Sequence, residues 1–205
     1  MERIRTLDAR AVRLSIDVLR QAEPADLGRD TPCAGWDLAD LLAHMTVQHE
    51  GFAAAARGEG GDLGRWAVRP LGAEPFAAYE AAAGAVVAAF AAVEAEEQPF
   101  VLPEFTTDRT FPAVQAIGFH FLDYVVHAWD VAATLGVPFA PDQDLVEAVL
   151  PLALSVPTGR ARTVPGAAFR PPLPPPPGED PLPVVLSALG RAPLHHPRGP
   201  AHSAG

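Results

Sequence analysis

The sequence predicts an all-α protein: an up-and-down bundle of four long helices, with C-terminal helices and a proline-rich extended segment. Apolar residues recur at helical spacing in several segments that proline and glycine separate. No internal repeat and no convincing alternating strand pattern appears. Amphipathic helices that bury their apolar stripes against one another form a bundle, so this class follows from the pattern.

The helix boundaries follow from residues that favour helix ends. The predicted helices run from about Leu7 to Glu23, from Asp37 to Arg57, from Pro75 to Ala95, from Pro112 to Leu135 and from Asp142 to Ser155, with a last short helix at Val184–Leu189. Asp37 can cap the second helix through its carboxylate. Gly136 can close the fourth in the left-handed conformation.

The connections have their own composition. Gly58–Gly72 is rich in glycine and predicts a flexible connection, and Phe100–Phe111 predicts a loop with a short extended piece. Proline excludes helix interiors and central strands, so Pro157–Pro183 is expected to run extended over the surface. We therefore expect one domain over residues 1–193 and a disordered tail at 194–205.

Composition excludes several classes of protein. The 205 residues are 49% hydrophobic, enough for a full core, yet no apolar run reaches the length of a membrane span. The formal net charge of -10 argues against wide contact with nucleic acid or anionic membrane. A single cysteine, Cys33, and the absence of a signal core at the start favour a cytoplasmic location.

Four ionisable side chains lie inside the otherwise apolar fourth helix. His120, Asp123, His127 and Asp130 fall within about 80° of one another on a helical wheel and form one polar seam. Large apolar residues border the seam: Phe119, Leu122, Val126 and Trp129. Imidazoles and carboxylates are costly to bury without hydrogen-bond partners or a cation, and a metal ion would satisfy them.

Asp123 and His127 are four residues apart, so a carboxylate and an imidazole can bind one ion from adjacent turns. Two ligands are insufficient, and the second helix offers His44 and His49 as a third. His49 lies near the centre of the apolar stripe and His44 at its edge, so periodicity alone favours His49. These residues can equally be core or surface histidines without a metal.

Three stretches resemble one known family. Thr31–Leu38 (TPCAGWDL), followed by Leu41–His44 (LLAH), resembles the turn and second-helix signature of the DinB-like superfamily. Asp123–Ala132 (DYVVHAWDVA) is similar to the acid-x3-His-x2-Asp motif of its mycothiol-dependent maleylpyruvate isomerase branch, which has many actinobacterial relatives. Leu189–Pro193 (LGRAP) is similar to that branch's closing Leu-Gly-Arg-Asp-Pro.

The resemblance implies a four-helix bundle that binds a divalent metal, commonly zinc. The ligand positions of the family correspond to His44, Asp123 and His127 in this sequence. The resemblance therefore favours His44 over His49 as the ligand from the second helix. The isomerase has a glutamate at the position of Asp123, whose arm is shorter. It also has a further C-terminal domain that is not evident here, where the proline-rich segment takes its place.

Other polar residues are candidates for further roles. His120 and Asp130 are the candidate catalytic residues: His120 as an acid/base group or extra ligand, Asp130 as a partner that fixes an imidazole. For His120 the alternative is a histidine at the pocket rim without a chemical role. For Asp130 the alternative is a structural carboxylate, and this alternative is favoured. His49 is a spare ligand candidate, Cys33 is expected to be structural, and the tail imidazoles at His195–His196 are expected to be solvated.

Three protein ligands leave a position open on the ion, as in catalytic sites. We therefore expect a metal-dependent isomerase or S-transferase that uses mycothiol on a small electrophilic substrate. A metal-stabilised binding protein without turnover and a metal-dependent hydrolase are the alternatives. The expected partners are a small-molecule substrate and a low-molecular-weight thiol, without nucleic acid or membrane, and a homodimer is left open.

Overall fold

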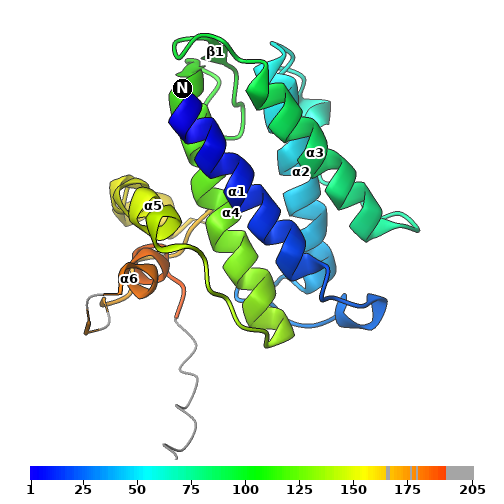
Figure 1. The fold of residues 1–205 in the computed structure, drawn as a ribbon, viewed down its shortest axis with the longest axis vertical. Coiled ribbons are helices and arrows are strands. Elements are labelled where there is room, and N and C mark those ends of the chain that lie inside the picture. Colours follow the sequence, from blue (N-terminus) through cyan, green and yellow to red (C-terminus); the bar gives the residue numbers. More distant parts are fainter. Residues whose placement is uncertain (165–166, 176, 179, 193–205) are drawn as a thin grey trace, which may run out of the picture.

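The computed structural model describes residues 1–164, 167–175, 177–178 and 180–192. Four long helices form the bundle (Figure 1): α1 (Glu2–Leu19), α2 (Leu38–Ala56), α3 (Pro75–Ala91) and α4 (Ala113–Leu135). Two shorter helices follow, α5 (Gln143–Ser155) and α6 (Pro181–Ala188). The predicted all-α four-helix bundle with C-terminal helices is confirmed. None of the helices in the described ranges is long and apolar enough to cross a membrane.

The neighbours of each helix were not predictable from the sequence. α1 packs against α3 and α4, and α2 packs against the same two helices. Figure 1 shows that α1 is antiparallel to α2 and parallel to α4, and that α2 is parallel to α3. Polar contacts agree with these directions, since Arg20 after α1 pairs with Glu80 near the start of α3, and Arg5 donates to the carbonyl of Ala91 at its end.

Parallel α2 and α3 require a connection that returns along the bundle. This connection, predicted to be flexible, holds a 3-10 turn at Leu63–Arg65 and a buried Trp66. The Trp66 indole donates to the carbonyl of Gly60 at 2.8 Å, and its ring lies over Gly51 of α2, where a Cβ would be only 2.5 Å away. Glycine at position 51 therefore allows the connection to pack directly on α2.

Helix ends agree with the predictions at the caps and differ where a proline or a tertiary contact intervenes. The Asp37 carboxylate accepts from the backbone N–H of Asp40 at 2.9 Å, and Gly136 closes α4 with φ +72°. α1 runs from Glu2 to Leu19 rather than from about Leu7 to Glu23. It begins five residues earlier because Ile4 also packs on the core, and it stops short of Glu23, which lies in the extended region before Pro24.

α3 ends four residues before the predicted Ala95. Arg5 of α1 donates to the free carbonyls of Ala91 and Val93, at 3.0 and 2.9 Å, and so stabilises the chain where it leaves the helix. The following loop returns through a small antiparallel sheet of β1 (Pro99–Phe100) and β2 (Phe111–Pro112), which is the extended piece that the sequence indicated.

The C-terminal region packs beside the bundle. α5 contacts α4 and α1, and α6 contacts α5. The prediction that Pro157–Pro183 is extended throughout is wrong at two places: Gly159–Arg162 forms a 3-10 turn, and α6 already begins at Pro181. The first helical turn needs no backbone N–H donors, so proline is tolerated there. The tail predicted to be disordered lies outside the described residues.

Candidate metal centre

The bundle brings three predicted ligands together from two helices. His44 lies on α2, and Asp123 and His127 lie one turn apart on α4; one ligand atom of each lies within 4.8 Å of the other two. His127 Nε2 is 3.4 Å from Asp123 Oδ1, and the rings of His44 and His127 meet edge to face with centroids 5.3 Å apart. Two atoms that each lie about 2.0–2.2 Å from one zinc ion can be at most about 4.4 Å apart, so the 3.4 Å between His127 Nε2 and Asp123 Oδ1 fits a shared ion.

This cluster, His44–Asp123–His127, is partly open to solvent. The His127 side chain is buried at 5% exposure, whereas the Asp123 side chain is 24% exposed and His44 is half-buried. Trp36, in the turn before α2, lies against His44 with ring centroids 4.9 Å apart. The cluster therefore has a closed side at His127 and an accessible side at Asp123.

The charges of the cluster are unequal. Burial and the neighbouring His127 lower the pKa of His44 to about 4. Burial alone would also lower the pKa of His127, but the carboxylates of Asp123 and Asp130 outweigh burial and raise it to about 10. At neutral pH the His127 ring of the metal-free cluster is thus protonated, whereas the His44 ring is neutral.

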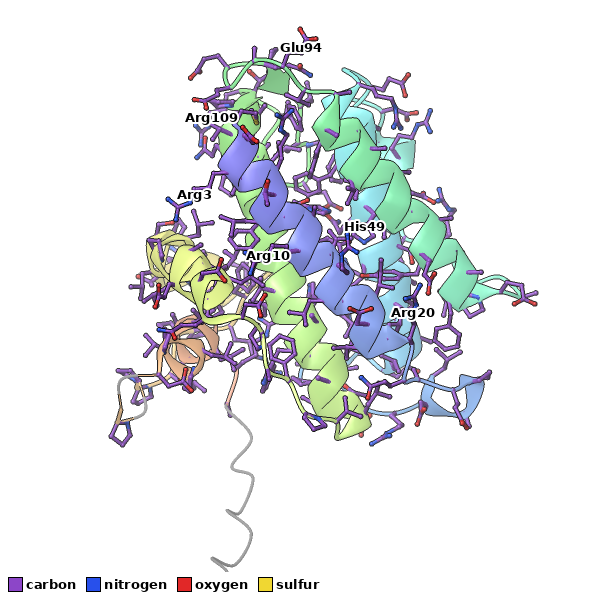
Figure 2. The ribbon with its side chains drawn as sticks, in the orientation of Figure 1. Arg3, Arg10, Arg20, His49, Glu94 and Arg109 are labelled. Atoms are coloured by element: carbon purple, nitrogen blue, oxygen red, sulfur yellow. The ribbon has the colours of Figure 1, made fainter. Side chains whose placement is uncertain are left out.

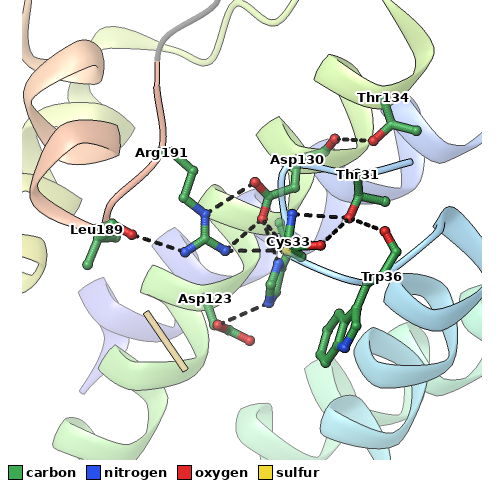
Figure 3. Close-up of polar contacts among 9 residues, drawn as sticks. Thr31, Cys33, Trp36, Asp123, Asp130, Thr134, Leu189 and Arg191 are labelled. Carbon is green, nitrogen blue, oxygen red and sulfur yellow. Dashed lines mark hydrogen bonds and ion pairs between the residues drawn. The ribbon is translucent and has the colours of Figure 1, made fainter. Parts of the chain in front are cut away.

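The second nitrogen of His127 belongs to a different set of contacts (Figure 3). Its Nδ1 lies 2.9 Å from Asp130 Oδ2, and Asp130 also accepts from Arg191 Nη2 at 2.9 Å and from the Cys33 thiol at 3.3 Å. Burial opposes ionisation of Asp130, but Arg191 and His127 overcome it and lower the pKa of Asp130 to about 2. A carboxylate that fixes one imidazole nitrogen leaves the other free to bind a metal.

Two groups of side chains in the described residues could therefore hold a cation, and they share His127. The other group is Cys33, His127 and Asp130. There the Arg191 guanidinium already supplies the positive charge. In the described part of the chain, no arginine pairs with Asp123, so the His44–Asp123–His127 cluster is the one that lacks a permanent cation.

Comparison with known proteins identifies the family of the chain. Residues 9–132 match the family model of the mycothiol maleylpyruvate isomerase N-terminal domain. The chain belongs to this family. Two Mycobacterium tuberculosis proteins, each named as uncharacterized, are 33% identical over 181 residues, which cover 85% of this chain and 90% of theirs.

Solved structures share the fold. A crystal structure of a mycothiol-dependent maleylpyruvate isomerase superposes with a TM-score of 0.64 and 16% identity, over 93% of this chain and 89% of the isomerase. A histidine-to-alanine mutant of such an isomerase superposes with a TM-score of 0.60, over 79% of this chain and 71% of the mutant, also at 16% identity. The shared fold thus extends beyond the family's N-terminal domain.

The three stretches that resemble the family meet in space. The turn at Thr31–Trp36 contributes Cys33, α4 contributes Asp130, and the closing stretch contributes Arg191, all within one hydrogen-bonded group beside His127 (Figure 3). Within the turn, the Thr31 hydroxyl lies 2.9 Å from the carbonyl oxygen of Trp36 and donates to it. Family motifs far apart in the sequence therefore build one neighbourhood.

His120 and His49 lie elsewhere. His120 Nδ1 is 2.6 Å from Asp8 Oδ1, and His120 Nε2 is 3.1 Å from His49 Nδ1, all inside the core. His49 stacks on Tyr124 with ring centroids 3.9 Å apart, and Figure 2 shows it between the helices of the bundle. The structure places neither histidine in the cluster predicted to bind metal.

Two partners of the predicted site residues were not found from the sequence. Asp8, paired with His120, is buried on the core face of α1 with Ala11, Val12 and Ser15, a spacing that could have marked it as a buried carboxylate. Arg191 lay in a recognised stretch but had no predicted partner, because nothing local links it to Asp130.

The rim of the cluster also holds an acid. Gln48 lies one turn after His44 on α2, and its amide donates to Glu104 at 2.6 Å. Burial, opposed by that hydrogen bond and reinforced by Asp123, raises the pKa of Glu104. The neighbouring Phe105 stacks on Phe119, one turn before Asp123 on α4, with centroids 5.0 Å apart. The loop that carries Glu104 thus lies beside the accessible side of the cluster.

Proposed function

We propose that this protein is a metal-dependent enzyme that uses mycothiol in an isomerase or S-transferase reaction on a small electrophilic substrate. The observation that carries the proposal is the convergence of His44, Asp123 and His127 from two helices. Family membership supports the thiol, since the solved relative is a mycothiol-dependent isomerase.

A divalent cation fits the donor set. Two imidazoles and one carboxylate are ligands that zinc accepts, and the shorter arm of Asp123 still reaches to 3.4 Å from His127 Nε2. The His127 Nδ1 contact with Asp130 leaves Nε2 available to the cation. Three protein ligands on an ion leave at least one position open, which is characteristic of catalytic sites.

The residues around the cluster can then be given roles. Bound zinc favours the thiolate form of a thiol and polarises a neighbouring carbonyl. His44, Asp123 and His127 would hold the ion, and Trp36 would form a wall against which a substrate can pack. Glu104 can hold a proton on its carboxyl group at the rim, because its raised pKa favours the protonated form.

The metal can be tested by elemental analysis of purified protein. We expect one zinc or similar ion per wild-type chain, and its loss from His127→Ala and Asp123→Asn. Asp108→Asn is the matched control, because Asp108 is exposed on a loop. Equal metal content in wild-type protein and Asp123→Asn would contradict the proposed site.

The reaction can be tested on the metal-loaded protein with mycothiol and maleylpyruvate, followed by substrate loss. We expect turnover that requires both the thiol and the metal. A protein that binds metal and gains thermal stability from it, yet turns over neither this electrophile nor an ester, would be a metal-stabilised binding protein. Turnover of an ester without thiol would indicate a hydrolase.

Two further proposals concern the setting of the protein. A low-molecular-weight thiol co-substrate and the single cysteine support a cytoplasmic location. A homodimer stays a prediction, which sedimentation velocity of the purified chain would test.

A further inference from the structure

The closing stretch Leu189–Pro193 turns a buried arginine toward the metal cluster. α6 ends in a Schellman motif: the N–H of Gly190 donates to Ser187 O at 3.1 Å, and the N–H of Arg191 donates to Leu186 O at 2.9 Å. Gly190 has φ +75°, and a Cβ there would lie 2.6 Å from the Cβ of Arg170. Glycine is therefore required at position 190, and this turn directs Arg191 inward, where it is 6% exposed.

Each nitrogen of the Arg191 guanidinium donates a hydrogen bond. It donates to both carboxylate oxygens of Asp130, at 2.9 and 3.3 Å, to the carbonyl of Leu189 at 3.2 Å and to Cys33 Sγ at 3.5 Å. Its central carbon lies 5.4 Å from the centre of the Phe169 ring. A two-pronged arginine contact holds a carboxylate in one orientation.

The orientation of Asp130 sets that of His127. Asp130 Oδ2 accepts from Arg191 and contacts His127 Nδ1, each at 2.9 Å, so one oxygen joins the two residues. An imidazole whose Nδ1 is held in this way can rotate little about its side-chain bonds, and its Nε2 stays directed at Asp123. Without Arg191, the buried carboxylate of Asp130 would lose its permanent cationic partner and keep only its contact with His127, so its orientation would no longer be fixed from two sides.

We propose that Arg191 is a positioning residue of the metal centre, which holds Asp130 so that Asp130 fixes the His127 imidazole for metal binding. This inference rests on the proposed metal centre and adds a function for the closing stretch. It also means that a segment outside the region matched by the family model, which ends at residue 132, helps to build the site.

Metal affinity in the full chain tests the proposal. Cobalt(II) is the probe, because its visible spectrum reports the ligand geometry and its affinity can be measured by competition with a chelator. We expect Arg191→Met and Asp130→Asn each to weaken binding by about 10- to 100-fold and to change the spectrum. Arg191→Lys, which keeps the charge but not the two-pronged contact, should fall between wild-type protein and Arg191→Met.

The double variant Arg191→Met/Asp130→Asn distinguishes an indirect from a direct effect. If Arg191 acts through Asp130, the double variant binds cobalt no more weakly than Asp130→Asn alone. An additive loss, or unchanged affinity in Arg191→Met, would overturn the proposal. If wild-type protein itself bound neither cobalt nor zinc, the metal centre would fail first and this inference with it.

Arg162→Met is the control for loosening of the C-terminal region. Arg162 is also buried, but among the residues that the structure describes it donates only to backbone carbonyls: those of Val156, Pro157, Arg170 and Ala188. We expect this variant to melt at a lower temperature while its cobalt spectrum stays that of wild-type protein. A spectrum altered as much as that of Arg191→Met would show that general loosening is the cause, and would overturn a specific role for Arg191.

Discussion

His127 is the residue on which both polar groups depend. Its Nε2 faces Asp123 and its Nδ1 faces Asp130, so one ring links the accessible cluster to the buried arginine contact. Two carboxylates raise its pKa to about 10, so His127 is charged at neutral pH when no metal is bound. In this state the proton takes the place of a cation beside Asp123.

Metal binding should therefore release a proton. At pH 7 we expect about one proton to leave per ion bound, because His127 must lose its charge while His44, with a pKa of about 4, is already neutral. Apparent affinity should then rise with pH up to about 10. Calorimetric titration in two buffers of different ionisation enthalpy measures this, and a binding enthalpy independent of buffer would contradict it.

His120 can be assigned a structural or a functional role by one substitution. His120→Ala leaves Asp8 buried without its partner, so we expect a loss of about 3–5 kcal/mol in the free energy of unfolding. Metal content should stay that of wild-type protein, since His120 bonds to Asp8 and His49 rather than to the cluster. Urea denaturation and elemental analysis on the same sample test both. Loss of metal with little change in stability would make His120 a ligand.

α2 and α4 contribute different ligands to the proposed metal centre. α4 carries two of the three proposed ligands on its own surface, so its local spacing sets their separation. α2 brings two histidines against α4 at different levels: His44 meets Asp123 and His127, whereas His49 meets His120 and Tyr124. Glycine at position 51 lets Trp66 pack on α2 and so helps to fix this helix in place.

Two glycines at the middle of helices should respond oppositely to alanine. In Gly51→Ala the new Cβ meets the Trp66 ring, so we expect a loss of about 1–3 kcal/mol in the free energy of unfolding. Gly84 on α3 has nothing within 4 Å of a Cβ, so Gly84→Ala should gain about 0.5–1 kcal/mol. Chemical denaturation of both variants tests the pair, and a destabilised Gly84→Ala would contradict the packing described here.

At the scale of the whole molecule, the proposed ion joins distant parts of the chain. The ligands come from α2 and α4, and the support comes from the turn before α2 and the stretch after α6. A ligand set that is complete only in the folded chain links metal binding to folding. Metal should thus stabilise the entire bundle.

Removal of the metal should lower the melting temperature. At a free zinc concentration about 1,000 times the dissociation constant, we expect about 4 kcal/mol of added stability. Calorimetry with and without chelator measures it. Asp123→Asn should lose the effect of the metal and Asp108→Asn should retain it; a melting temperature that the chelator does not change in wild-type protein would argue against the linkage.

Local features of the sequence determined much of the fold. Prolines and glycines set most helix ends, Asp37 capped α2 as expected, and the spacing of Asp123 and His127 placed both on one face of α4. These properties depend on residues within a few positions of one another, so the chain need not be folded for them to be predicted.

Tertiary structure alone decided how distant residues pair. The helical wheel favoured His49, yet packing turns His49 into the core against Tyr124, and His44 faces Asp123 and His127 as the family resemblance implied. The contact between Arg191 and Asp130 likewise has no local signal. Such pairings depend on the direction and rotation of packed helices, which arise from the sum of many weak contacts along the chain rather than from any one stretch of it.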